Sequence, residues 1–111
     1  MFMKMYQYHI RPDKVEEYLQ IQEQAFEIYS RYLQIHTMYF KSNEDDTKWV
    51  EISRYKDETE YKKSIAIINE HAEIQALFAQ FQSLLDPTKS EIREEDFIEM
   101  KNFSKDIGGW I

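Results

Sequence analysis

The chain has 111 residues, which favours one domain over residues 1–111 with a hydrophobic core of its own, and aromatic residues make up 15% of it. Its formal net charge is −7, from 21 acidic residues against 14 lysines and arginines, which disfavours binding to nucleic acid or to anionic lipid. It has no cysteine, which excludes disulfides, thiolate nucleophiles and cysteine-bound zinc or iron–sulfur centres.

The two glycines, Gly108 and Gly109, lie close to the end of the sequence. The dinucleotide fingerprint and the phosphate-binding loop both need glycines between a strand and a helix, so nucleotide cofactors held in those ways are excluded. Residues 1–10 are too few and too polar for a signal or membrane-spanning segment. We therefore expect a cytoplasmic protein with no membrane partner.

The first half of the chain predicts a strand, a helix and a hairpin. Residues 2–10 alternate polar with β-favouring side chains and stop at Arg11-Pro12, which indicates a strand. Apolar residues then recur every three or four positions from about residue 13 to 33, which predicts an amphipathic helix. Residues 35–42 and 48–55 read as two strands that a polar turn at 43–46 joins into a hairpin.

The second half predicts further helix and one more strand. Helical spacing returns at Tyr61 and changes phase near Asn69, which indicates either a kink or two consecutive helices before Pro87. We expect the last strand at residues 97–103, followed by a C-terminal tail at 104–111. The order βαββαβ predicts an α+β, ferredoxin-like fold, a four-stranded antiparallel sheet with two helices on one face.

Strand alternation divides the predicted sheet into two faces. We expect the first set to meet the helices: Met3, Met5, Val50, Ile52, Ile98 and Met100. The opposite face would carry Phe2, Lys4, Tyr6, Tyr8, Trp49, Glu51, Ser53, Tyr55, Phe97, Glu99, Lys101 and Phe103. That face is too aromatic for water and too polar for a sealed core, so we expect a second copy of the chain to cover it and enclose a pocket.

Two stretches carry a family resemblance. "EISRYKDETEYKKSI" is similar to the strand-to-helix signature of antibiotic-biosynthesis-monooxygenase-like proteins, and "YHIRPDKVEEYL" resembles the first strand, turn and helix start of that superfamily. The resemblance spans roughly residues 3–103 and implies a dimeric α+β barrel, hence a homodimer with a pocket in each subunit. Members include cofactor-free oxygenases of polycyclic phenols and haem-degrading enzymes. Ser64 stands where several members have histidine or tryptophan, which weakens both the haem-degrading interpretation and any oxygenase mechanism that needs a histidine at this position.

Glu51 is the candidate catalytic residue. In an aromatic pocket its carboxylate would have a raised pKa and could remove a phenolic or enolic proton, leaving a substrate anion that reacts with oxygen. Alternatively, Glu51 pairs with Lys4 or Lys101, or binds backbone across the dimer interface. The predicted substrate-binding set is Tyr6, Tyr8, Trp49, Tyr55, Phe97 and Lys101, whose aromatic members could equally be packing in the interface.

No pair of the three histidines has a metal-ligand spacing, and we expect neither a metal site nor a bound cofactor. Two functions follow from these residues and the resemblance. The first is a cofactor-independent monooxygenase-like enzyme that acts on a small aromatic or polyphenolic compound. The alternative is a non-catalytic small-molecule-binding or stress-related dimer that uses the same pocket.

Overall fold

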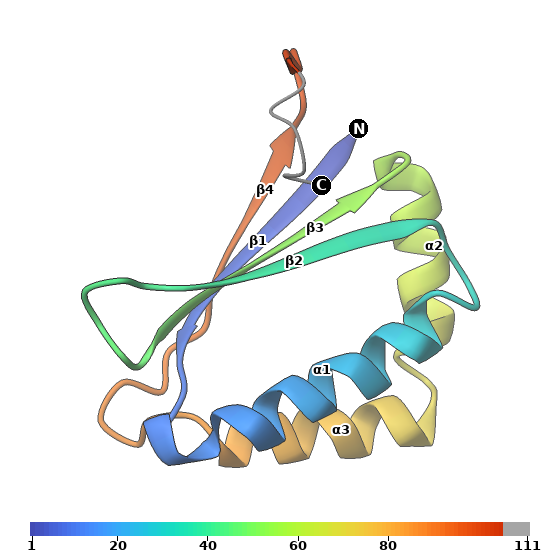
Figure 1. Ribbon diagram of the computed structural model, residues 1–111. Coiled ribbons are helices and arrows are strands. Elements are labelled where there is room, and N and C mark those ends of the chain that lie inside the picture. Colours follow the sequence, from blue (N-terminus) through green and yellow to red (C-terminus); the bar gives the residue numbers. More distant parts are fainter. Residues whose placement is uncertain (106–111) are drawn as a thin grey trace.

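The computed structural model describes residues 1–105 as one antiparallel sheet with helices on one side of it (Figure 1). The elements in chain order are β1 (Phe2–His9), the short 3₁₀ helix η1 (Pro12–Lys14), α1 (Val15–Tyr29), β2 (Ile35–Lys41), β3 (Lys48–Tyr55), α2 (Glu58–Ile68), α3 (Ala72–Ser83) and β4 (Arg93–Ile98). The strand order is β2-β3-β1-β4, and every neighbouring pair is antiparallel. The predicted α+β, ferredoxin-like fold is confirmed.

Local sequence signals explain where the helices begin and end. Pro12 fixes the first turn of η1, which leads directly into α1. Asp57 caps α2, because its side chain accepts a hydrogen bond from the backbone N–H of Glu60 at 2.7 Å. The phase change near Asn69 marks a break between two helices, since α2 ends at Ile68 and α3 begins at Ala72.

The core lies between the sheet and the helices. Figure 1 shows α1 and α3 side by side along one end of the sheet, while α2 covers the other end. Tyr8 of β1 packs edge-on against Phe81 of α3 with ring centroids 4.9 Å apart, and against Tyr18 of α1 at 5.8 Å. Tyr8, Tyr18 and Ile68 are all almost completely buried. Large aromatic rings therefore supply much of the apolar area that holds the helices on the sheet.

The predicted assignment of the sheet faces is wrong for β1 and β3. Phe2, Tyr8, Trp49 and Tyr55 are buried in the core against the helices, with Trp49 only 7% exposed. The side chains of Met3, Met5, Val50 and Ile52 therefore lie on the opposite side of the sheet. Alternation gives two faces without telling which one is buried, and here both faces carry large apolar residues. The helices carry aromatic surfaces that pack against the aromatic face of the sheet, so that face is the buried one.

The last strand is also displaced from its predicted position. β4 spans Arg93–Ile98 instead of residues 97–103, and its cross-strand neighbours on β1 run from Gln7 opposite Arg93 to Phe2 opposite Ile98. Residues 93–96, which precede the predicted strand and include three acidic side chains, form most of β4. An edge strand keeps such charges hydrated, and the ammonium of Lys4 on β1 binds two of them, Asp96 at 2.6 Å and Glu94 at 2.8 Å.

The side of the sheet that carries no helix is called here the open sheet face. Its apolar members are Met3, Met5, Met38, Phe40, Val50, Ile52 and Phe97. Of the predicted tail at 104–111, only residues 104 and 105 belong to the described part of the chain, and the remainder lies outside it. Within residues 1–105, no helix is both long and apolar enough to cross a membrane.

Candidate functional site

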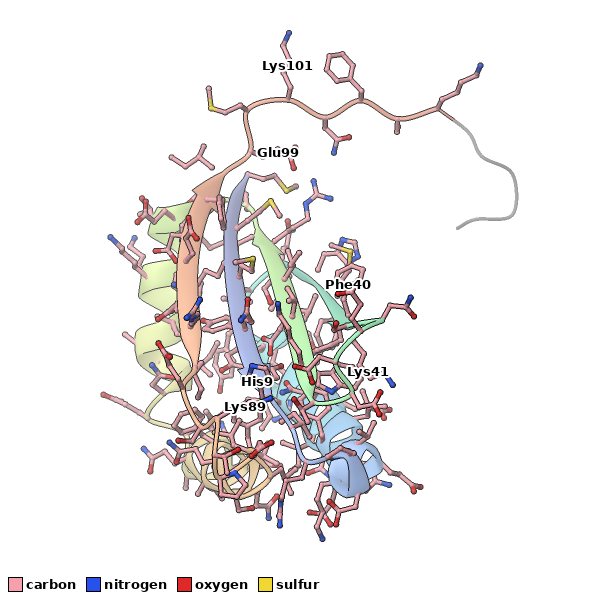
Figure 2. All side chains as sticks on the ribbon, turned by 90° about the vertical axis from the view of Figure 1, so that its left-hand side faces the viewer. His9, Phe40, Lys41, Lys89, Glu99 and Lys101 are labelled. Atoms are coloured by element: carbon pink, nitrogen blue, oxygen red, sulfur yellow. The ribbon has the colours of Figure 1, made fainter. Side chains whose placement is uncertain are left out.

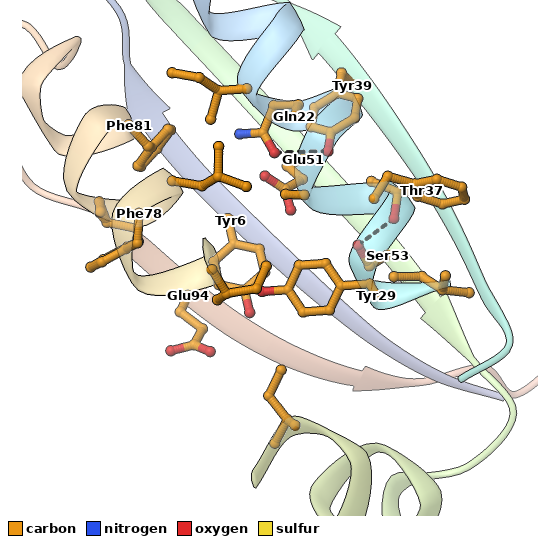
Figure 3. A pocket seen from close by; sticks show the side chains of 18 of the residues that line it. Tyr6, Gln22, Tyr29, Thr37, Tyr39, Glu51, Ser53, Phe78, Phe81 and Glu94 are labelled. Atoms are coloured by element: carbon orange, nitrogen blue, oxygen red, sulfur yellow. Dashed lines mark hydrogen bonds between the residues drawn. The ribbon is translucent and has the colours of Figure 1, made fainter. Parts of the chain in front are cut away.

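A cavity of about 310 Å³ lies between the sheet and the helices (Figure 3). All four strands and all three α-helices contribute to its lining. Its aromatic lining residues are Tyr6, Tyr8, Phe26, Tyr29, Tyr39, Tyr55, Tyr61, Phe78 and Phe81. The volume is at the lower end of the range of about 300–1,000 Å³ in which proteins hold small organic ligands.

The sheet register aligns the polar residues of the floor of this cavity. Four side chains stand opposite one another across neighbouring strands: Tyr39 on β2, Glu51 on β3, Tyr6 on β1 and Glu94 on β4. Because paired residues in an antiparallel sheet share a face, all four side chains point toward the helices. The two carboxylates of the cavity are thus separated by the ring of Tyr6.

A chain of hydroxyl groups holds Glu51. The hydroxyl of Tyr8 donates to Oε1 of Glu51 at 2.9 Å, and it lies 2.6 Å from the hydroxyl of Tyr18. Since Tyr8 has one hydroxyl proton and gives it to Glu51, Tyr18 is the donor in the second hydrogen bond. The sequence-based alternative that paired Glu51 with Lys4 or Lys101 is wrong. Among residues 1–105, Tyr8 is the one group that donates to this carboxylate.

Burial sets the ionisation of Glu51. Removal from water disfavours the charged form and raises the pKa of this carboxyl to about 7, while the hydrogen bond from Tyr8 acts in the opposite direction. Both protonation states are therefore populated near neutral pH. A carboxylate with such a pKa can accept a proton from a weak acid and release it again within one reaction cycle.

The surrounding tyrosines remain neutral. Burial raises the pKa of Tyr8, Tyr18, Tyr39 and Tyr55 well above the usual value, and the charge of Glu51 adds to the increase in each. The same two causes raise the pKa of Tyr29 to about 12. These hydroxyl groups therefore serve as hydrogen-bond donors and do not act as bases at physiological pH.

Two further hydrogen bonds tie the polar lining together, and Figure 3 shows both. The hydroxyl of Tyr39 donates to Oε1 of Gln22 at 3.0 Å, which links β2 to α1. The hydroxyl groups of Thr37 and Ser53 lie 2.9 Å apart on neighbouring strands. These contacts fix the positions of the polar groups around Glu51.

The charged groups of the cavity lining are all acidic. Glu51 and Glu94 are the two charged residues that line it, and within residues 1–105 no lysine, arginine or histidine does so. Glu94 is paired with the buried ammonium of Lys4, which also lies 5.2 Å from the ring centroid of Tyr61. Burial lowers the pKa of Lys4, but the hydrogen bonds to Asp96 and Glu94 outweigh it and keep this amine charged. Glu51 has no such cation beside it.

The structure divides the predicted site residues into two groups. Tyr6, Tyr8 and Tyr55 line the cavity together with Glu51. Trp49 lies buried in the neighbouring core and is not part of the lining. Phe97 faces Met3 across the strands on the open sheet face and is 41% exposed.

Lys101 is not near the cavity. It belongs to the exposed segment that leaves the sheet beyond β4, and Figure 2 shows its side chain pointing away from the rest of the molecule. Its predicted role rested on a last strand that reached residue 103. Because β4 ends at Ile98, that role is withdrawn.

Sequence reasoning missed the lining that the helices and β2 provide. On α1 the cavity residues are Ile21, Gln22, Ala25, Phe26 and Tyr29, a set with the three- and four-residue spacing of one helical face. That spacing was visible in the sequence. It predicts an amphipathic helix, but nothing in a helical stripe distinguishes residues that fill a core from residues that line a cavity in it.

Comparisons with known proteins bear on the fold. No family model matches the sequence, and no curated protein matches it. Among solved structures, a variant of SnoaB, a cofactor-independent oxygenase from Streptomyces nogalater, superposes with a TM-score of 0.72 at 9% identity, over 94% of this chain and 97% of that one. An uncharacterized NIPSNAP domain protein from Burkholderia xenovorans has a TM-score of 0.71 at 18% identity, over 96% and 100% of the two chains.

A third similar structure is an antibiotic biosynthesis monooxygenase, with a TM-score of 0.68 at 14% identity. The superposition covers 91% of this chain and 100% of that one. At such identities the similarity establishes the fold alone. The chain shares its fold with these three proteins, as its resemblance to antibiotic-biosynthesis-monooxygenase-like proteins predicted.

Proposed function

We propose that the protein is a cofactor-independent monooxygenase-like enzyme that acts on a small aromatic or polyphenolic compound, with Glu51 as its general base. The observation that carries this proposal is a carboxylate of raised pKa in an aromatic cavity, with Oε1 held by Tyr8. The fold that the chain shares with a cofactor-independent oxygenase supports it. Tyr6, Tyr8 and Tyr55 are the proposed substrate contacts.

The proposed chemistry begins with proton transfer. Glu51 removes a proton from an acidic CH₂ group of the substrate, and the carbanion gives one electron to O₂. The two radicals combine to a peroxide. The proton on Glu51 passes to the outer oxygen of the peroxide. Glu51 then removes the remaining proton from the same carbon as the O–O bond breaks, and the hydroxide that leaves takes this proton, so that CH₂ and O₂ become C=O and H₂O. Atoms and electrons balance with O₂ as the single co-reactant.

The experiment is oxygen consumption with an anthrone, a three-ring compound with an acidic CH₂ group. We expect turnover by the parent protein and a loss of at least a hundredfold in Glu51→Gln, which keeps the shape of the side chain but cannot accept the proton. Glu94→Gln is the matched control, because it alters the other carboxylate of the cavity. Parental turnover in Glu51→Gln would show that Glu51 is not the base.

Non-catalytic binding of a small molecule is the second candidate function. It is favoured by the charges of the cavity, since no cationic side chain within residues 1–105 lines it to stabilise an anionic intermediate. A protein of this kind would bind the anthrone without consuming oxygen. Calorimetric binding measured beside the oxygen assay separates the two functions.

We further propose that the active form is a cytoplasmic homodimer joined through the open sheet face. This face carries three methionines, Val50, Ile52 and two phenylalanines, an apolar composition typical of subunit interfaces. The proposed interface therefore differs from the aromatic face that the sequence suggested. Each subunit would keep its own cavity, because the cavity lies on the helix side.

A further inference from the structure

We propose that the cavity binds a monovalent organic cation, a substituted ammonium compound, with its charged nitrogen between Glu51 and the surrounding tyrosine rings. This inference concerns the ligand class of the cavity. It does not depend on the oxygenase reaction, and it holds equally for a protein that only binds its ligand.

The first observation is an acidic cavity with one uncompensated charge. Glu51 has a single hydrogen-bond donor, the neutral hydroxyl of Tyr8. The other lining carboxylate, Glu94, is bound to Lys4 at 2.8 Å. Within residues 1–105, no cationic side chain lines the cavity, so an anionic ligand would meet repulsion that nothing offsets. A cationic ligand would supply the missing counter-charge.

The second observation is the ring of aromatic groups around this carboxylate. Tyr6 and Tyr39 flank Glu51 on the neighbouring strands, Tyr8 binds it, and Tyr29 faces the same space from α1. The face of an aromatic ring is negative, and quaternary ammonium groups are recognised by several such rings placed around them. An apolar wall with one buried carboxylate suits a large, weakly hydrated cation better than a metal ion, which needs several oxygen ligands.

The third observation is that, among the groups of residues 1–105 that face the site, Glu51 is the one that changes charge between pH 6 and 8. The titratable groups near it are tyrosines, and burial keeps them neutral: Tyr6 and Tyr8 on β1, Tyr18 and Tyr29 on α1, Tyr39 on β2 and Tyr55 on β3. From α2 the cavity receives Tyr61, whose pKa is also raised by burial, and α3 contributes no titratable lining residue. Glu94 on β4 remains paired with Lys4.

Binding of a cation would therefore be coupled to the release of a proton. The cation stabilises the ionised carboxylate, whose pKa in the free protein is about 7. At pH 8 the site is already ionised, whereas at pH 6 about nine-tenths of the molecules must first lose the proton. The dissociation constant should be about tenfold larger at pH 6 than at pH 8. A neutral ligand of the same shape should show no such dependence.

The experiment compares two probes that differ in one atom. They are (4-hydroxymethylphenyl)trimethylammonium and its uncharged counterpart 4-tert-butylbenzyl alcohol, each titrated calorimetrically into the full chain at pH 6 and pH 8. We expect the cation to bind at least tenfold more tightly than the alcohol at pH 8. Glu51→Gln should abolish that preference and keep the affinity for the alcohol, while Glu95→Gln, on the open sheet face, should retain the preference.

Equal affinity of the parent protein for the two probes at pH 8 would overturn the inference, as would a preference that survives in Glu51→Gln. If that variant does not fold, the pH dependence of the parent protein decides, because an equal dissociation constant at pH 6 and pH 8 also contradicts the inference. Failure of the oxygenase proposal is separate, since it is read from oxygen consumption with the anthrone.

Discussion

The hydroxyl of Tyr8 donates a hydrogen bond of 2.9 Å to Glu51 and lies 2.6 Å from the hydroxyl of Tyr18, so a core tyrosine on α1 supports the one donor to the cavity carboxylate. Tyr8 stands on β1 and Glu51 on β3, which are hydrogen-bonded neighbours. The position of the carboxylate is thus fixed by the same packing that joins the sheet to α1. The candidate site and the core packing therefore share three side chains, those of Tyr8, Tyr18 and Glu51.

Tyr8→Phe should raise the pKa of Glu51 above its present value of about 7. The hydrogen bond from Tyr8 favours the ionised form, and its loss leaves burial unopposed. A hydrogen bond to a charged group contributes about 1.5–3 kcal/mol, which corresponds to an increase of about one to two pH units. Carboxyl ¹³C chemical shifts during a pH titration measure it. Tyr18→Phe, one hydroxyl further away, should give a smaller increase, and an unchanged pKa in Tyr8→Phe would contradict the assignment.

Glu51→Gln should stabilise the folded protein at alkaline pH. The pKa of Glu51 is raised from 4.5 to about 7 on folding, so the folded state binds the proton more tightly than the unfolded state does. Stability of the parent protein should therefore fall as pH rises from about 4.5 to 7, by about 3 kcal/mol from this group. Urea unfolding should show the variant more stable by up to that amount at pH 8 and similar to the parent at pH 5. A variant less stable than the parent at pH 8 would refute the predicted cost of ionisation.

Ile52→Glu should prevent the proposed dimer. Ile52 stands near the middle of the open sheet face, opposite Met5 and Met38 on the two neighbouring strands. Two copies of the new carboxylate would be buried close together, at a cost that the interface cannot offset. Sedimentation velocity should find a dimer for the parent and a monomer with unchanged circular dichroism for the variant. Ile67→Glu on α2, where the side chain is already 56% exposed, is the matched control and should remain dimeric. A monomeric parent at micromolar concentration would refute the interface.

The stem of Lys4 should matter more for stability than its charge does. The side chain is 8% exposed, and its Nζ lies 5.9 Å and 5.2 Å from the ring centroids of Phe2 and Tyr61, while its partners Glu94 and Asp96 are 52% and 51% exposed. Lys4→Ala would leave a cavity and cost about 2–3 kcal/mol, whereas Lys4→Met fills the space and leaves two hydrated carboxylates, at a cost of about 1 kcal/mol. Thermal unfolding of both variants measures the difference. Equal losses would mean that the ion pairs dominate.

Much of the fold follows from sequence patterns. The spacing of apolar residues changed from two to three or four between the first strand and the first helix, Arg11-Pro12 marked the end of that strand, and the break near Asn69 appeared as a phase shift. β4 was misplaced because four of the residues in Arg93–Ile98 are charged, which is atypical of a strand when it is considered alone. Its stability depends on Lys4 and on the exposure of a sheet edge, and neither is visible in the local sequence.

The candidate site was also predicted only in part, because its position depends on contacts that the local sequence does not show. The structure brings Glu51, Tyr6, Tyr8 and Tyr55 together in one cavity lining, because residues on one side of paired strands stay together whichever way that side faces. Their roles in catalysis and substrate binding stay predictions. The direction of that side was wrong, since alternation carries no information about which face the helices cover. Trp49 was separated from the cavity by packing around Tyr18, and such packing depends on contacts between residues far apart in the sequence.

The acidic edge that β4 presents has a consequence for assembly. Glu94, Glu95 and Asp96 occupy successive positions on a strand whose outer backbone groups are free to pair with another chain. Two molecules that approach edge to edge would bring these charges into contact, and the repulsion opposes continuation of the sheet into fibres. If Glu94, Glu95 and Asp96 were all replaced by neutral residues, that protection would be lost and β4 would be open to pairing with a strand of another molecule.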